Sequence, residues 1–259
     1  MIIFCLYFEI WALFLFLLWY HYVHKLRIIQ IIWFWSIYLI TVKDKTMIEC
    51  FLWYSIFANS LLEGSFFYFM KLLEEKIISD GLILDGDILK VDNFLNHQMD
   101  TRLLDEMGKE FKRLFNDKKI TKILTIESSG IGISVMASRY FDYCPVIFAK
   151  KGKSANVTGD VYECRERSST RNVDYNVQVS KKYLDSSDTV LIIDDFLANG
   201  EALNALISIC HDAKANIAGC GIVITKAYQK GEKRILDMGI EVKSLARIVE
   251  MKDGEIKFG

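Results

Sequence analysis

The sequence from Met70 onward predicts an α/β fold with a mainly parallel sheet flanked by helices. Short apolar runs alternate with segments of helical spacing, which is typical of parallel strands joined by helical crossovers. The clearest run is Val190–Ile193, whose uninterrupted apolar character predicts a strand buried on both faces. It is followed by a short loop and by Glu201–His211, whose apolar residues recur with helical spacing.

Each predicted helix depends on apolar residues that recur with a helical period. The clearest stripe consists of Leu103, Leu104, Met107, Phe111 and Leu114. The first helix is expected to stop at Asp80-Gly81, because glycine ends helices readily. The predicted helices are Met70–Ile78, Thr101–Phe115, Ile131–Tyr140, Glu201–His211 and Glu232–Met238.

The strands are predicted from short apolar runs bounded by turn residues. Leu82–Asn93 should contain an extended pair around Asp85-Gly86, and Val249–Phe258 should form a hairpin turning at Asp253-Gly254. The polar stretch Lys150–Asn176 loses all periodicity, which predicts a lid or a disordered segment. The remaining strands are expected at Ile120–Ile126, Val146–Ala149, Val177–Ser180, Thr189–Asp194, Ile217–Thr225 and Val242–Ile248.

Two acids and a loop follow the strand that begins at Val190. Asp194 and Asp195 are expected at its carboxyl end, where open α/β sheets bind ligands. The loop Ala198-Asn199-Gly200-Glu201-Ala202 then leads into a helix whose unpaired N–H groups and dipole favour a phosphate. The acids could accept hydrogen bonds from a sugar diol or hold a metal ion through water. The alternative is that they only cap the next turn.

A second anion site is predicted at Glu127-Ser128-Ser129-Gly130, between a strand and a helix. Its N–H groups and serine hydroxyls could bind phosphate oxygens, and Gly130 would let the backbone approach closely. The alternative is a simple helix cap.

Two lysines follow predicted strands. Lys150 opens the polar stretch and Lys226 ends the Ile217–Thr225 strand, so both could face a ligand at the same sheet edge. The alternatives are a solvated basic loop, which applies equally to Lys151 and Lys153, and a surface charge at position 226.

Several segments together resemble the type I phosphoribosyltransferases, and within them the xanthine-specific branch of bacterial purine salvage. The resemblance covers Met70 to the end of the chain and does not cover residues 1–69. It is carried by VLIIDDFLANGEA (Val190–Ala202), IESSGI (Ile126–Ile131), VDNFLNHQMD (Val91–Asp100), IAGCGIVITKAYQ (Ile217–Gln229) and SLARI (Ser244–Ile248).

The resemblance implies transfer of ribose 5-phosphate from phosphoribosyl pyrophosphate to N9 of xanthine, with Mg²⁺ accompanying the pyrophosphate substrate. Asp194 and Asp195 are then catalytic, whereas Ala198–Ala202, Glu127–Gly130 and Lys150 bind phosphoribosyl pyrophosphate. It further implies a lid over the substrate and a homodimer. Many relatives carry hydroxyl residues in the loop after the acids. Ala198–Ala202 has none, so its backbone N–H groups and the Asn199 amide should bind more of the phosphate.

The resemblance also implies a small hood over the base, formed by Val91–His97. The Leu89 backbone and the Asn96 side chain would contact the 2-oxo edge of xanthine, and Lys226 would donate to its 6-oxo group. For Asn96 the alternative role is a cap or turn residue before the next helix.

Composition separates the alternative functions. Guanine and hypoxanthine share the 6-oxo group, so a phosphoribosyltransferase for those bases is the nearest alternative. A regulator of the same fold that senses phosphoribosyl pyrophosphate would need a basic DNA-binding surface, and the net charge of −1 argues against nucleic-acid partners. The six cysteines form no CxxC pair and suggest reduced thiols in the cytoplasm, and the four histidines lack metal-ligand spacing.

Residues 1–69 form a separate apolar extension to the phosphoribosyltransferase domain expected at 70–259. All five tryptophans lie before residue 54, and Ile2–Tyr20 is long enough to span a bilayer. One interpretation is a membrane hairpin with Lys25 and Arg27 on the cytoplasmic side, which would make the protein membrane-tethered. The interpretation we favour is a mis-assigned start, with Met70 as the first residue.

We predict that a protein beginning at Met70 is soluble, unfolds cooperatively and has full activity, because every predicted site residue lies downstream. The apolar extension would otherwise have to meet lipid or aggregate. Mass spectrometry of the native protein should find its amino terminus at or just after Met70. Native peptides from Ile28–Ile40 in a membrane fraction would contradict this prediction.

Overall fold

The computed structural model describes residues 71–84, 88–152, 159–168, 173–252 and 254–259. The apolar extension and the predicted turn at Asp85-Gly86 lie outside the described residues. Within the described part of the chain, no helix is both long and apolar enough to cross a membrane.

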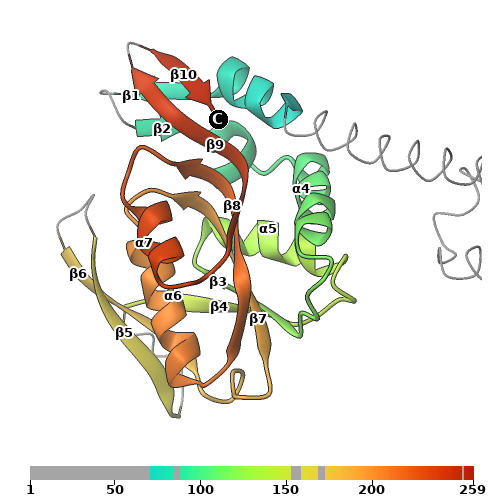
Figure 1. Cartoon of the computed structure of the whole chain (residues 1–259), viewed down its shortest axis with the longest axis vertical. Coiled ribbons are helices and arrows are strands. Elements are labelled where there is room, and N and C mark those ends of the chain that lie inside the picture. The colour runs from blue at the N-terminus through green and yellow to red at the C-terminus, as the bar shows by residue number, and fades with distance from the viewer. Residues whose placement is uncertain (1–70, 85–87, 153–158, 169–172, 253) are drawn as a thin grey trace, which may run out of the picture. The chain divides into compact units, whose positions relative to one another are not determined.

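The described residues contain an eight-stranded sheet in the order β10-β9-β8-β7-β3-β4-β6-β5 (Figure 1). The neighbours β9, β8, β7, β3 and β4 run parallel, and β10, β6 and β5 are antiparallel additions at the two sides. This confirms the predicted mainly parallel sheet. The strands are β3 (Lys122–Ile126), β4 (Val146–Lys151), β5 (Val161–Ser168), β6 (Val173–Ser180), β7 (Thr189–Leu197), β8 (Asn216–Lys226), β9 (Val242–Lys252) and β10 (Glu255–Phe258).

Helices cover the sheet on both faces. They are α4 (Thr101–Leu114), α5 (Ser129–Ser138), α6 (Glu201–Asp212) and α7 (Gly231–Asp237). One buried cluster joins α4 and α5 to the sheet, and a second joins α6 to its other face. In β7, Leu191 and Ile193 belong to the first cluster, whereas Val190 and Ile192 belong to the second. The apolar run therefore fills both cores, as a strand with alternating side chains must.

A small substructure precedes α4. Residues 71–80 are helical, and the short strands β1 (Leu82–Leu84) and β2 (Ile88–Lys90) pair antiparallel, as predicted. A π-helical turn, η1 (Asp92–Asn96), follows and buries Phe94 and Leu95. These two side chains share one core cluster with Leu245 and Met251 of β9. The segment predicted as a hood is therefore fixed to the sheet by a continuous apolar core.

The prediction that Lys150–Asn176 lacks regular secondary structure is wrong for much of its length. Within Lys150–Asn176, β5 and the beginning of β6 form an antiparallel ladder that extends from Val161↔Ser180 to Ser168↔Val173. Tyr162 and Cys164 of β5 pack against the core cluster that contains α6. Pairing and contact with α6 override the polar composition, because ladder hydrogen bonds need no apolar periodicity.

The strands β7 and β9 are among those that extend further than predicted. The strand β7 was expected to end at Asp194 but continues to Leu197, so Asp194 and Asp195 lie within its last part rather than at its carboxyl end. Val242–Ile248 and the first arm of the terminal hairpin form a single strand, β9. In both cases a neighbouring strand pairs with the extension: β8 extends the ladder of β7 to Leu197, and β10 pairs with β9.

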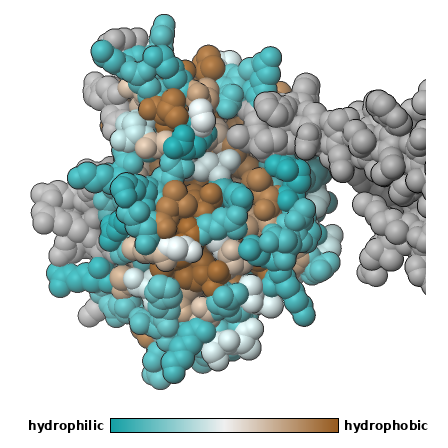
Figure 2. Space-filling view, in the orientation of Figure 1, coloured by the Kyte–Doolittle hydropathy of each residue, from teal (hydrophilic) through white to brown (hydrophobic). Residues whose placement is uncertain are grey.

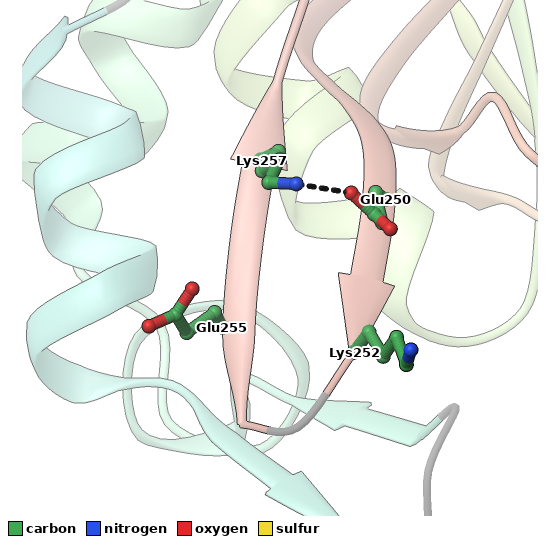
Figure 3. A pocket seen from close by; sticks show the side chains of 4 residues that line it. All are labelled: Glu250, Lys252, Glu255 and Lys257. Carbon is green, nitrogen blue, oxygen red and sulfur yellow. Dashed lines mark hydrogen bonds and ion pairs between the residues drawn. The ribbon is translucent and has the colours of Figure 1, made fainter.

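The surface in the orientation of Figure 1 is mostly hydrophilic, with smaller hydrophobic areas between the charged residues (Figure 2). A hollow on the β9–β10 hairpin is lined by Glu250, Lys252, Glu255 and Lys257, and Lys257 pairs with Glu250 across the two strands (Figure 3). The two acids balance the two lysines, and none of the predicted site residues lines this hollow.

Candidate active site

The parallel strands bring the predicted site residues to one edge of the sheet. β3, β4, β7 and β8 are adjacent and parallel, so their carboxyl ends meet at the same edge. Glu127–Gly130 follows β3, Lys150 and Lys151 end β4, and Lys226 ends β8. The loop Ala198–Ala202 leaves β7 and enters α6 at this edge.

Asp194 is the acid of this region whose pKa is most strongly shifted. The Asp194 side chain is 5% exposed, and its Oδ1 accepts a hydrogen bond from the Asp195 backbone N–H at 3.0 Å. Burial, and next the negative charge of Asp195, raise the pKa of Asp194 well above its ordinary value, while Lys151 opposes the shift. Asp194 therefore tends to hold a proton, and Asp195 is the more accessible of the two acids.

The hood contacts this acid pair directly. Asn96 Nδ2 donates to Asp195 Oδ2 at 2.5 Å, although the two residues lie 99 positions apart in the sequence. Asn96 Oδ1 is buried and has no hydrogen-bond partner in the structure. Its interpretation as a helix cap is wrong, since Asp100 caps α4 by accepting from the backbone N–H groups of Arg102 and Leu103. Leu89 is a buried residue of β2 in the same substructure.

The loop after β3 is tied to the end of β4. The Glu127 N–H donates to the Ala149 carbonyl at 3.0 Å, and Glu127 Oε1 accepts from the Lys151 N–H at 2.5 Å. The Glu127-Ser128 peptide bond is cis. Ser128 makes no side-chain capping hydrogen bond to α5, so the cap interpretation does not apply to it. Because the Ser128 hydroxyl does not cap the helix, it can bind a ligand together with the N–H groups of the first turn of α5.

Gly130 is packed tightly at the start of α5. A Cβ added there would lie 2.0 Å from Thr125 Oγ1 and 3.4 Å from Asp194 Oδ1. Thr125 is fully buried in β3, and its Oγ1 has no hydrogen-bond partner in the structure. The loop can therefore approach Asp194 this closely only with glycine at position 130.

The loop after β7 has the geometry expected of an anion site. Gly200 adopts a positive φ of 86° and precedes α6, with no side-chain cap at the helix start. Glycine has no side chain that could accept from the N–H groups of the first turn of α6. The helix dipole favours an anion at these groups. Positive φ is readily adopted only by glycine, which explains Gly200 within Ala198–Ala202.

Lys226 is a buried lysine. It is the last residue of β8 and is 8% exposed, so its interpretation as a surface charge is wrong. Lys150 is half-buried and Lys151 is exposed at the end of β4. An ammonium group only donates hydrogen bonds, so at the carboxyl end of β8 it could bind a ligand oxygen.

Sequence reasoning missed two contributors. Thr125 lies under Gly130, and the Lys151 backbone holds Glu127. Neither contributor can be recognised in a single sequence, because Thr125 lies within an apolar strand and every residue except proline has a backbone N–H. Within the described ranges, no group of three histidine, cysteine or acidic side chains is arranged to hold a metal ion.

We predict that Gly130→Ala destabilises the protein and lowers activity. The new Cβ would meet Thr125 Oγ1 at 2.0 Å, and overpacking of this kind costs about 1–3 kcal/mol in a core. Thermal unfolding and steady-state turnover would measure the two effects.

Two further variants test the cause of this effect. Adding Thr125→Ala to Gly130→Ala removes the clashing oxygen and should recover much of the stability. Gly132→Ala in the same helix is the matched control, because its new Cβ would meet mainly the flexible end of Met99. An equal loss of stability in Gly130→Ala and Gly132→Ala would contradict the steric explanation.

We predict that Asp194→Asn raises the melting temperature at neutral pH while it lowers turnover. The pKa of Asp194 is higher in the folded chain than in the unfolded chain. Its contribution to the free energy of unfolding is therefore complete below the pKa of the unfolded chain, and it is lost as the pH rises through the pKa of the folded chain. The neutral amide of the variant avoids that loss. The melting temperature of Asp194→Asn should therefore exceed that of the unaltered protein by an amount that grows with pH. A gain of a few degrees corresponds to about 1 kcal/mol in a domain of this size. A difference that shrinks with rising pH would contradict the prediction.

Comparisons with known proteins agree with this geometry. Residues 91–251 match the family model for the phosphoribosyl transferase domain. Xanthine phosphoribosyltransferase 2 of Clostridium botulinum strain Langeland is 53% identical over 189 residues, covering 73% of this chain and 100% of the relative. Xanthine phosphoribosyltransferase of Clostridium novyi is 52% identical over 189 residues, covering 73% and 99%.

Solved structures of adenine phosphoribosyltransferases share the fold. The protein from Rhodothermus marinus superposes with a TM-score of 0.56 at 19% identity, over 68% of this chain and 99% of that one. The protein from Trypanosoma brucei, in complex with AMP, pyrophosphate and ribose-5-phosphate, gives a TM-score of 0.58 at 15% identity, over 68% and 79%. At these identities the likeness concerns the fold alone. The family match and the close sequence relatives show that the chain belongs to the phosphoribosyltransferase family.

Proposed function

We propose that this protein is a xanthine phosphoribosyltransferase of purine salvage. It transfers ribose 5-phosphate from phosphoribosyl pyrophosphate to N9 of xanthine, giving xanthosine 5′-monophosphate and pyrophosphate. The observation that carries the proposal is the acid pair Asp194–Asp195, which lies between two anion-binding loops and contacts the hood. The relatives at about half identity, named xanthine phosphoribosyltransferases, support the choice of base.

The two loops divide phosphoribosyl pyrophosphate between them. Glu127–Gly130, at the start of α5, supplies N–H groups and hydroxyls for pyrophosphate, with Lys150 as a neighbouring cation at the end of β4. Ala198–Ala202, at the start of α6, supplies N–H groups for the 5′-phosphate. The Asn199 side chain adds an amide in the loop that has no hydroxyl residues.

The acid pair serves the ribose between these loops. Breaking the bond from C1 to pyrophosphate places positive charge on the ribose ring. A carboxylate at Asp195 stabilises that charge and accepts hydrogen bonds from ribose hydroxyls. Burial, and next the charge of Asp195, raise the pKa of Asp194, so this carboxyl accepts a proton more readily than an ordinary one, which limits repulsion within the pair.

The base lies between Lys226 and the hood. The Lys226 ammonium donates to the 6-oxo group, where adenine would present an amino donor instead. Asn96 Oδ1, which is buried without a partner, accepts an N–H from the opposite edge of the base, and the Leu89 backbone completes the contact. The amino group of guanine could satisfy the same oxygen, so guanine is the second candidate.

Mg²⁺ fits this site as a companion of the substrate. Mg²⁺ prefers oxygen ligands and commonly binds through one or two carboxylates together with waters and substrate phosphates. Asp195 is the accessible carboxylate between the two anion loops, which suits that donor set. When bound, the ion would neutralise part of the charge on pyrophosphate.

We further propose that the protein is cytoplasmic and forms a homodimer. Reduced thiols are consistent with the first, since Cys144, Cys210 and Cys220 are free in the described part of the chain. Exposed apolar side chains at Val135 and Phe148 offer contact area for the second.

The deciding experiment is steady-state kinetics with xanthine, guanine and hypoxanthine at saturating phosphoribosyl pyrophosphate. The proposal expects the highest kcat/KM for xanthine. A preference for guanine would transfer the assignment to the second candidate. Binding of phosphoribosyl pyrophosphate without turnover of any base would favour a regulator of the same fold.

We predict that Lys226→Met weakens the use of 6-oxopurines and leaves the binding of phosphoribosyl pyrophosphate largely intact. A hydrogen bond to a charged group contributes roughly 1.5–3 kcal/mol, or about one to two decades in kcat/KM for xanthine. Kinetics with each substrate varied in turn would separate the two effects. If only the affinity for phosphoribosyl pyrophosphate falls, Lys226 serves the other substrate.

A further inference from the structure

The start of α7 lies directly against the loop Ala198–Ala202. The Gly231 N–H donates to the Ala198 carbonyl at 2.9 Å. A Cβ added to Gly231 would lie 2.4 Å from that carbonyl oxygen and 2.9 Å from the Gly200 nitrogen. The approach is also tight from the other side, because a Cβ on Gly200 would lie 3.1 Å from Gly231 Cα. The two segments therefore pack backbone against backbone, with glycine on both sides.

An ion pair holds α7 in this position. Arg247 Nε donates to Glu232 Oε1 at 2.9 Å, and Arg247 Nη2 donates to Glu232 Oε2 at 2.8 Å. The Glu232 side chain is only 15% exposed. A bidentate contact between two planar groups fixes direction as well as distance. Arg247 belongs to β9 and is in register with Thr225 of β8, so the pair anchors α7 to the rigid part of the sheet.

We propose that Glu232 and Arg247, acting through Gly231, are positioning residues for the 5′-phosphate of phosphoribosyl pyrophosphate. The inference depends on the proposed assignment of Ala198–Ala202 to that phosphate. Since this loop has no hydroxyl residues, its affinity depends on where its peptide N–H groups point. The Gly231 hydrogen bond fixes the Ala198 peptide, and the ion pair fixes the helix that carries Gly231.

The physical consequence is selective. Without the ion pair, α7 can pivot on its loop, and the N–H groups of Ala198–Ala202 lose their alignment. A displacement of about 1 Å is enough to weaken a positioned contact strongly. The pyrophosphate loop Glu127–Gly130 is tied instead to β4, through Ala149 and Lys151, and should not change.

The test uses the full chain and the variants Glu232→Ala and Arg247→Ala. Titration calorimetry measures the binding of ribose 5-phosphate and of pyrophosphate separately. We expect both variants to bind ribose 5-phosphate about tenfold more weakly, as for the loss of one contact to a charged group. Pyrophosphate affinity should stay unchanged. The matched control is Asp237→Asn, which removes the exposed Lys233–Asp237 pair on the same helix and should alter neither affinity.

A second set of variants separates positioning from folding. Gly231→Ala keeps the ion pair but displaces the loop, and it should reproduce the selective loss of ribose 5-phosphate. In Glu232→Ala combined with Arg247→Ala, the loss should not exceed that of Arg247→Ala alone. Both single variants remove the same ion pair, and Arg247→Ala also removes the hydrogen bond to the Gly259 carbonyl. If Glu232→Ala fails to fold, Arg247→Ala and Gly231→Ala still carry the comparison.

Two results would overturn the inference: equal weakening of both anions, or unchanged ribose 5-phosphate affinity in the variants. The proposed function fails differently. A wild-type chain that binds ribose 5-phosphate but does not use xanthine would contradict the choice of base, and the comparison of variants would still decide the positioning role.

Discussion

The structure of the site depends on keeping two adjacent carboxyl groups at a desolvated sheet edge. Asp194 is nearly inaccessible, and Asp195 follows it directly in β7. Burial and mutual repulsion both oppose ionisation of Asp194, so the pair stores unfavourable free energy in the folded state. Such a pair persists only where the surrounding structure holds it firmly. β7 meets this requirement, because it is hydrogen-bonded to β3 on one side and β8 on the other.

The same requirement explains the glycines around the acids. An anion loop that binds through backbone N–H groups must approach its neighbours more closely than a side chain allows. Gly130 approaches Thr125 and Asp194, while Gly200 and Gly231 approach each other. Each contact fixes the direction of the loop peptides. The loops therefore obtain much of their geometry from packing against the sheet and α7, and only Ala198–Ala202 lacks side-chain hydroxyls.

The sequence predicted the parallel strands well, because strands buried on both faces must be apolar throughout. Val190–Ile193 shows this, since its side chains alternate between two cores. The β5–β6 pair was missed for the opposite reason. Its stability comes from a ladder between two polar segments and from contact with α6. Neither source of stability requires apolar residues to recur at a regular spacing in the sequence. The placement of the acids inside β7 depends likewise on pairing with β8.

The candidate site residues were predicted largely through family resemblance and the rule that parallel strands bind ligands at their carboxyl ends. Contacts between distant residues could not be predicted in this way. Asn96 was expected near the base, but its hydrogen bond to Asp195 depends on how η1 packs against the sheet. Gly231 and the Glu232–Arg247 pair carried no motif, because their importance arises from proximity to Ala198.

The hydrogen bond between hood and acid also gives a reason for base selectivity. An ionised carboxylate only accepts hydrogen bonds, so Asp195 requires the NH₂ group of Asn96 to face it. The carbonyl oxygen of Asn96 is then turned away from the acid, and it is the atom left buried without a partner. A buried acceptor favours a base that presents an N–H there and disfavours one that presents C–H or another acceptor. In the proposed site, the acid assigned to the ribose would therefore also fix the orientation of the side chain assigned to the base.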